Sequence, residues 1–111
     1  MSGHSTRTHR EHAQRLRDRV VAAGVMDRRL RRAALERDSG GSSLPEPYEA
    51  LVRQIGLDSA RVTDAQVNAV REAAGTEKAA FELVFAAAVG AGLRRWDAAE
   101  RVITEAEDAA E

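Results

Sequence analysis

The chain has 111 residues, a formal net charge of −1 and no cysteine. The lack of thiols excludes disulfides, thiol nucleophiles, cysteine metal sites and iron–sulfur clusters. The length predicts one domain with a modest core, and the Ala-rich composition with only two prolines favours helices.

Charge divides the chain into two unequal parts. Residues 1–38 carry ten Arg and five acidic residues, whereas residues 39–111 carry seven Lys or Arg and 13 acidic residues. Such parts attract each other, within one chain or between subunits. The stretch DSGGSS (38–43) is typical of a flexible connection. We therefore predict a basic helical N-terminal arm (1–38), a flexible linker (39–43) and a compact helical domain (44–111).

In chain order, residues 1–8 are predicted to be a disordered start. Helices are then predicted over residues 9–23, 28–37, 44–56, from a Thr63 cap to Ala74, and over 77–109. Asp27 is expected to cap the second helix, and Gly56 to end the third. Thr63 and Gln66 form a capping-box pattern, the clearest helix start in the chain. No alternating apolar pattern predicts a strand.

The last helix contains FELVFAAAVGAG (81–92), in which Glu82 is followed by ten residues without a polar side chain. A helix that is apolar on all sides must be covered on all sides. Gly90 and Gly92 each cost about 1 kcal/mol of helix propensity, which close packing would offset. The other helices are short, so we expect a second subunit to cover the rest. The predicted oligomer interface consists of Phe81, Phe85, Val89, Gly90, Gly92 and Trp96.

The stretch from Leu44 to Ala99, LPEPYEALV…ARVTDAQVNAVREAAGTEKAAFELVFAAAVGAGLRRWDAA, resembles the carboxymuconolactone decarboxylase and alkylhydroperoxidase D-like family, in its cysteine-free branch. The resemblance implies an all-α fold, an alkylhydroperoxidase D-like helical unit with a long Ala/Gly-rich C-terminal helix. It also implies a homo-oligomer, commonly a trimer or hexamer.

Redox members of that family carry Cys-x-x-Cys, a following His and an upstream Glu. The corresponding positions here fall near Ala60, Thr63, Val67 and Tyr48, so none of the four is retained. Thiol peroxidase activity is therefore excluded for this chain alone. Decarboxylase members use His in a small-acid pocket, but no His follows residue 12.

Three charged residues are weak catalytic candidates. Glu82 is either a buried acid with a raised pKa or an exposed carboxylate favoured near a helix N-terminus. Arg94 and Arg95 could bind an anion beside Trp96, which is otherwise a core residue. We assign no catalytic or cofactor-binding residue and expect no cofactor.

The three histidines, His4, His9 and His12, lie near the N-terminus without further ligands, so we assign no metal site. Arg28, Arg29, Arg31 and Arg32 form a basic face. No aromatic residue interleaves with it, so we expect a solvated face or contact with an acidic subunit surface instead of nucleic acid.

The leading hypothesis is a cytoplasmic, non-redox homo-oligomer that acts as a structural or partner-binding protein and has no membrane segment. One alternative is a small-molecule-binding or decarboxylase/lyase-type enzyme with an inter-subunit pocket. The other is a nucleic-acid-associated protein that uses its basic arm.

Overall fold

The computed structural model describes the backbone of residues 2–110 and the side chains of residues 7–110. Its α-helices are α1 (Ser2–Ala22), α2 (Arg28–Glu36), α3 (Tyr48–Asp58), α4 (Asp64–Ala74) and α5 (Glu77–Ala110), with 3-10 turns η1 (Arg37–Ser39) and η2 (Ser59–Arg61). The described backbone contains no strand. The predicted all-α class and the long C-terminal helix are confirmed.

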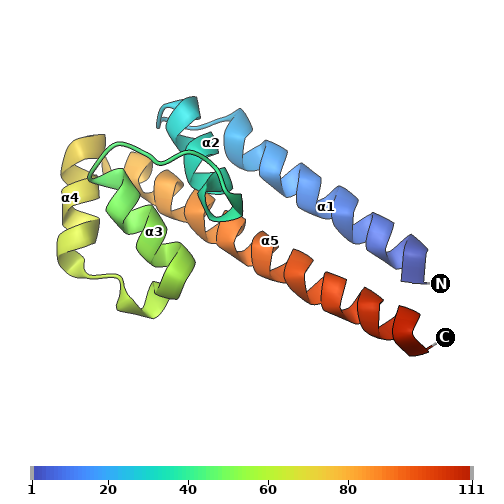
Figure 1. The fold of residues 1–111 in the computed structure, drawn as a ribbon. Coiled ribbons are helices and arrows are strands. Elements are labelled where there is room, and N and C mark those ends of the chain that lie inside the picture. The colour runs from blue at the N-terminus through green and yellow to red at the C-terminus, as the bar shows by residue number, and fades with distance from the viewer. Residues whose placement is uncertain (1, 111) are drawn as a thin grey trace.

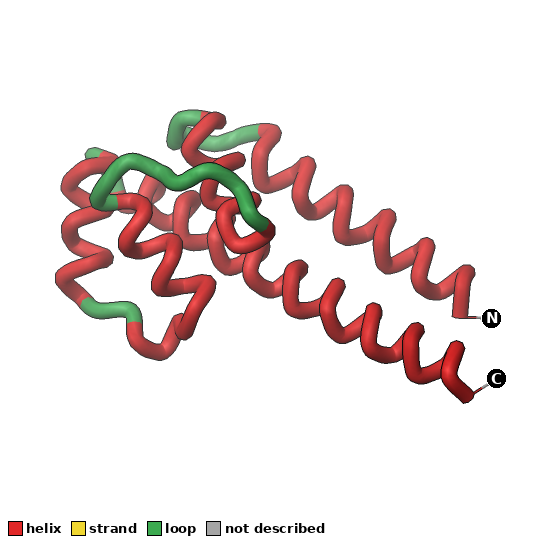
Figure 2. The backbone as a smooth tube through the Cα atoms, viewed as in Figure 1, coloured by secondary structure: helices red, strands yellow, loops and turns green. Residues whose placement is uncertain are grey.

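Helix α5 organises the molecule. Helices α2, α3 and α4 surround its N-terminal half, and α1 runs antiparallel to its C-terminal half, so both chain ends lie at the same end (Figure 1). Short loops join the helices, apart from the longer segment that crosses from η1 to α3 (Figure 2). The result is elongated, with extents of 54 × 28 × 21 Å. None of the described helices is long and apolar enough to cross a membrane.

The core lies between the N-terminal half of α5 and helices α2, α3 and α4. Leu51, Val70 and Leu83 are fully buried there, beside alanines of α5. Ala34 and Leu35 of α2 belong to the same cluster. Residues on both sides of the predicted linker thus share one core. The division into an N-terminal arm and a compact domain stays a prediction.

Two predicted helix starts are confirmed by their hydrogen bonds. The Asp27 carboxylate accepts from the Arg29 amide at 2.7 Å. Thr63 and Gln66 make the reciprocal capping box: the Gln66 amide donates to the Thr63 hydroxyl at 3.2 Å, and the Thr63 amide donates to the Gln66 side chain at 3.0 Å. These short-range contacts fix the first turns of α2 and α4.

Three predicted boundaries are wrong. Residues 2–8 continue α1 instead of forming a disordered start, because no proline interrupts the chain there. Helix α3 begins at Tyr48, since two prolines in 44–47 remove amide donors and disfavour helical backbone before them. Gly56 does not end α3 but lies buried inside it, where a Cβ would stand 2.7 Å from the Asp38 carboxylate.

Candidate functional site

Glu82 joins the α1–α2 connection to α5. Its carboxylate accepts hydrogen bonds from the amides of Val25 at 3.0 Å and Met26 at 2.8 Å. Burial alone would raise the pKa of Glu82. The two amide donors and the charges of Arg31 and Lys78 outweigh that effect and leave the pKa below its ordinary value. Glu82 is therefore ionised at neutral pH and bound by backbone amides, so the first of the two alternatives, a buried acid with a raised pKa, is not supported.

The two other polar candidates also hold the chain together. Arg94 donates to the Asp38 carboxylate, which ties α5 to η1. Arg95 donates to the Gly56 carbonyl at 2.8 Å, which ties α5 to α3. The larger surface cavities are lined by other residues. Glu82, Arg94 and Arg95 thus bind three different segments, and the structure does not bring them together around a shared cavity.

Arg31 is buried and does not lie on the predicted basic face. Arg31 is only 4% exposed. Its Nε and Nη1 have no hydrogen-bond partner among the described atoms. A Cβ on Gly24 would lie 2.2 Å from Nη1 and 2.7 Å from a Glu82 carboxylate oxygen. The signal was available: Arg31 shares a helical face with Ala34 and Leu35, at spacings of three and four.

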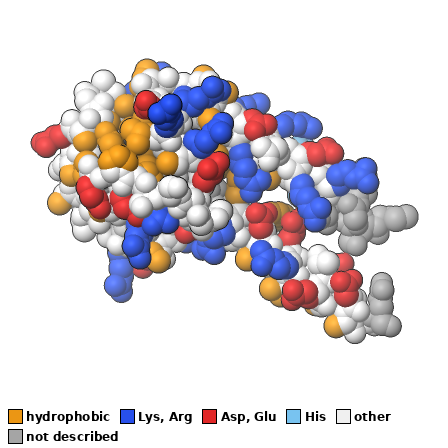
Figure 3. Space-filling model, turned by 45° about the horizontal axis from the view of Figure 1, so that its top comes forward, with side chains coloured by type: hydrophobic (Ala, Val, Ile, Leu, Met, Phe, Trp, Pro, Cys, Tyr) orange, Lys and Arg blue, Asp and Glu red, His pale blue; other side chains and the backbone are white. Residues whose placement is uncertain are grey.

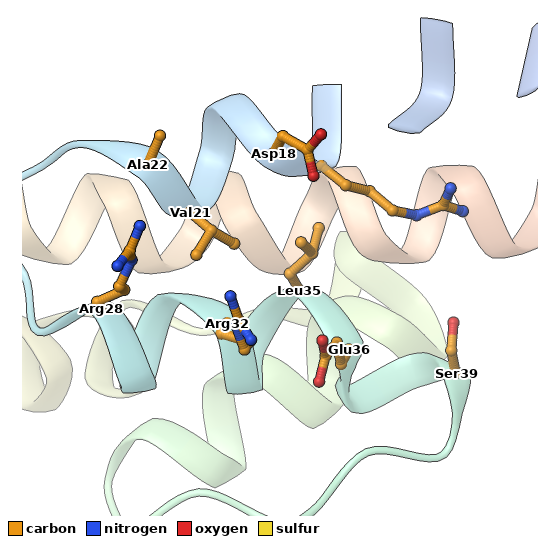
Figure 4. A pocket seen from close by; sticks show the side chains of 9 residues that line it. Asp18, Val21, Ala22, Arg28, Arg32, Leu35, Glu36 and Ser39 are labelled. Atoms are coloured by element: carbon orange, nitrogen blue, oxygen red, sulfur yellow. The ribbon is translucent and has the colours of Figure 1, made fainter. Parts of the chain in front are cut away.

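A cavity of about 480 Å³ lies between α1 and α2. Arg28 and Arg32 extend from α2 toward α1, and Val21 points from α1 toward α2 beside them (Figure 4). Among the described residues, neither of these two guanidinium groups makes a hydrogen bond or ion pair. Arg17 also lines the cavity, and Asp18 and Glu36 offset two of its three positive charges. This arrangement could receive a small anion.

The largest unpartnered apolar surface runs along α5. Phe81, Phe85, Trp96 and Ile103 are 65%, 46%, 48% and 58% exposed. With the exposed small residues between them they form one line along the helix, here called the outer stripe: Phe81, Phe85, Ala88, Gly92, Trp96, Ala99, Ile103 and Ala106. The spacings of three and four place these residues on one face.

The two predicted interface glycines lie on opposite faces of α5, because two residues turn a helix by about 200°. A Cβ on Gly90 would lie 2.0 Å from the Leu35 carbonyl oxygen of α2, so Gly90 is covered within its own chain. A Cβ on Gly92 would meet nothing within 4 Å. Val89 is half-buried at the edge of the core. Only the exposed members of the predicted set can therefore contact a second subunit.

Helix α1 borders the outer stripe on one side. The rings of His9 and Trp96 meet edge-on with centroids 5.3 Å apart, and Arg17 pairs with Asp97 at 3.4 Å. His12 lines the same shallow groove as His9. Among the described side chains no group of three or more metal-binding residues lies together, and the side chain of His4 lies outside the described residues.

Comparison with protein-family models, with curated proteins and with solved structures found no match to this chain. The case for a function therefore depends on the geometry of α5 and of the α1–α2 cavity.

Proposed function

We propose that this chain is a non-redox helical protein that assembles into homo-oligomers through the outer stripe of α5 and acts as a structural or partner-binding module. The observation that carries the proposal is the exposed line of aromatic and small residues around Gly92. The resemblance to the cysteine-free alkylhydroperoxidase D-like branch is part of the same proposal, since that family is oligomeric.

The size of the apolar surface supports this proposal. Buried aromatic side chains cover about 150–250 Å² each, so the exposed fractions of Phe81, Phe85 and Trp96 leave about 300 Å² of aromatic surface outside the core. The largest apolar patch on a typical monomer covers about 300–600 Å² and is often functional, and these aromatic side chains alone reach the lower end of that range. The polar candidates provide no competing explanation, because Glu82, Arg94 and Arg95 are bound within the chain.

The conformation of α5 supports it further. Gly92 costs about 1 kcal/mol of helix propensity in the middle of a long helix. No group of the same chain approaches it, so nothing within the monomer offsets that cost. A neighbouring helix that packs closely on this face would offset the cost of Gly92.

The test is the mass of the protein in solution, by native mass spectrometry and light scattering, for the wild type and for Phe85→Glu. A wild-type oligomer that Phe85→Glu converts to a folded monomer is expected, because a charge on the outer stripe would be buried without a partner. Leu57→Glu is the matched control, since Leu57 is 71% exposed on α3 and lies off the stripe. A monomeric wild type at high concentration would refute the proposal.

The α1–α2 cavity favours a second candidate function, the binding of a small anion. Its unpaired Arg28 and Arg32 are spaced by one helical turn, a spacing suited to one phosphate or carboxylate group. This candidate does not conflict with assembly, because the cavity lies between α1 and α2, away from the outer stripe.

A further inference from the structure

We infer that the outer stripe is occupied by α5 of a second copy of this chain, packed antiparallel about a two-fold axis near residue 94. This inference rests on the proposed assembly and adds the identity and direction of the partner helix. Three observations carry it: the order of large and small residues, the distribution of charge along α5, and the length of the exposed face.

The order of residues along α5 is complementary to its own reverse. From Phe85 onward, the residues of the outer stripe recur at steps of three and four, which is the spacing of helices that pack along a shared line. In an antiparallel pair centred near residue 94, Gly92 of one copy faces Trp96 of the other. Phe85 then faces Ile103, and Ala88 lies within one position of Ala99. Each large side chain lies opposite a residue that leaves room for it or packs against it.

A parallel pair in register would lose this fit. Trp96 would face Trp96 of the other copy, and Gly92 would face Gly92. The two tryptophans would hold the helices apart, and the two glycines would leave a gap. Interfaces that bind tightly have interior-like packing density, and gaps of this kind forfeit contact energy. The exposed Gly92 is explained by the antiparallel arrangement, where it receives the indole ring of the other chain.

Charge favours the same direction. Residues 97–110 contain five acidic residues and one Arg. A parallel pair would bring both acidic ends together, and like charges at short range repel. In the antiparallel pair each acidic end lies instead along residues 77–93 of the other α5, which carry two acidic residues and one Lys, so fewer like charges meet. Figure 3 shows the acidic side chains, with apolar ones among them, on the projecting end of α5.

The exposed face is long enough for a stable pair. Helix α5 has 34 residues and is therefore about 50 Å long. With a contact width of about 10 Å, full overlap of two such helices would bury about 500 Å² per copy, or about 1,000 Å² in total. That area reaches the lower limit of specific protein–protein interfaces. A pairing of only the N-terminal halves would fall well below it.

Disulfide cross-linking tests the direction, and the absence of native cysteine makes every cross-link assignable. A disulfide needs Cα atoms within about 7 Å. Ala106→Cys alone is adjacent to its own copy in a parallel pair, but about 36 Å from it along the axis in the antiparallel pair. A mixture of Ala88→Cys and Ala99→Cys chains joins only in the antiparallel register. Ala73→Cys, exposed on α4, measures cross-linking by random collision.

We expect most of the mixed Ala88→Cys and Ala99→Cys protein to become a covalent dimer under mild oxidation. Ala106→Cys should remain at the collision level of Ala73→Cys while its native mass is that of a dimer. Efficient self-cross-linking of Ala106→Cys, or an oligomer in which the mixture does not cross-link, overturns the antiparallel pair and leaves the proposed assembly standing. A monomeric wild type overturns both. A wild-type complex with a chain of different mass, in place of a second copy, overturns this inference.

Discussion

Replacement of Gly90 by alanine tests how closely α2 and α5 pack. The added Cβ would stand 2.0 Å from the carbonyl oxygen of Leu35, 2.9 Å from its carbonyl carbon and 3.3 Å from its Cα. The obstacle is backbone and cannot rotate away. Helix α2 must therefore move by roughly 1 Å or more to restore normal contact distances.

The size of the effect follows from two opposing contributions. Alanine improves helix propensity by about 1 kcal/mol. Overpacking of a well-packed core usually costs about 1–3 kcal/mol, and here the displaced helix carries the buried residues Ala34 and Leu35. We expect Gly90→Ala to lower the free energy of unfolding by about 1–2 kcal/mol. The midpoint of thermal unfolding should fall by about 5–10 °C.

The matched control is Gly92→Ala, the same change on the same helix where a Cβ meets nothing within 4 Å. Both changes are made in the Phe85→Glu background, so that assembly does not contribute to the measured stability. Urea unfolding followed by circular dichroism should show Gly92→Ala to be stabilised by up to about 1 kcal/mol. If Gly90→Ala is as stable as Gly92→Ala, the close approach of α2 and α5 is refuted.

Two further predictions concern charged groups. Glu82→Gln should lower the free energy of unfolding at pH 7, because the pKa of Glu82 in the folded state lies below its unfolded value, near 4.5. The stabilisation by the Glu82 carboxylate is present above that unfolded value and is lost as pH falls through the folded pKa. The difference in free energy of unfolding between wild type and Glu82→Gln should therefore shrink from pH 7 to pH 3; a constant difference would contradict it. For the α1–α2 cavity, titration of inorganic phosphate should shift the amide NMR signals of Arg28, Arg32 and Ser39. Arg32→Gln should abolish these shifts, whereas Arg101→Gln, a change on the far end of α5, should not; shifts that survive Arg32→Gln would rule out this site.

The helices were predictable because their signals are local. The Thr63–Gln66 capping box and the Asp27 cap each involve residues two or three apart, and the structure contains both. At the start of α3, the two prolines delay the helix to Tyr48, because proline disfavours helical backbone in the residue before it.

The roles of the charged candidates could not be predicted, because their partners are distant in sequence. Glu82 receives the amides of Val25 and Met26 from the other end of the chain, and Arg94 reaches Asp38. No periodic pattern encodes such pairings. Arg31 is an intermediate case. Its spacing from Ala34 and Leu35 predicts a buried position, its charge predicts an exposed one, and in the structure Arg31 is buried.

The distribution of residue size around α5 is the reverse of that expected for a helix that functions alone. Its buried face consists mainly of alanines and Gly90, which let α2 and α3 approach closely, while Phe81, Phe85 and Trp96 lie on the exposed face. At about 25 cal/mol per Å², the roughly 300 Å² of exposed aromatic surface represents an upper limit of about 7 kcal/mol of apolar stabilisation that the monomer does not obtain. Alanines in the core reduce the thickness of each subunit, and the aromatic residues outside gain their stabilisation only when another surface covers them. The same helix therefore packs inside the chain through small residues, and the assembly proposed above would use its large ones.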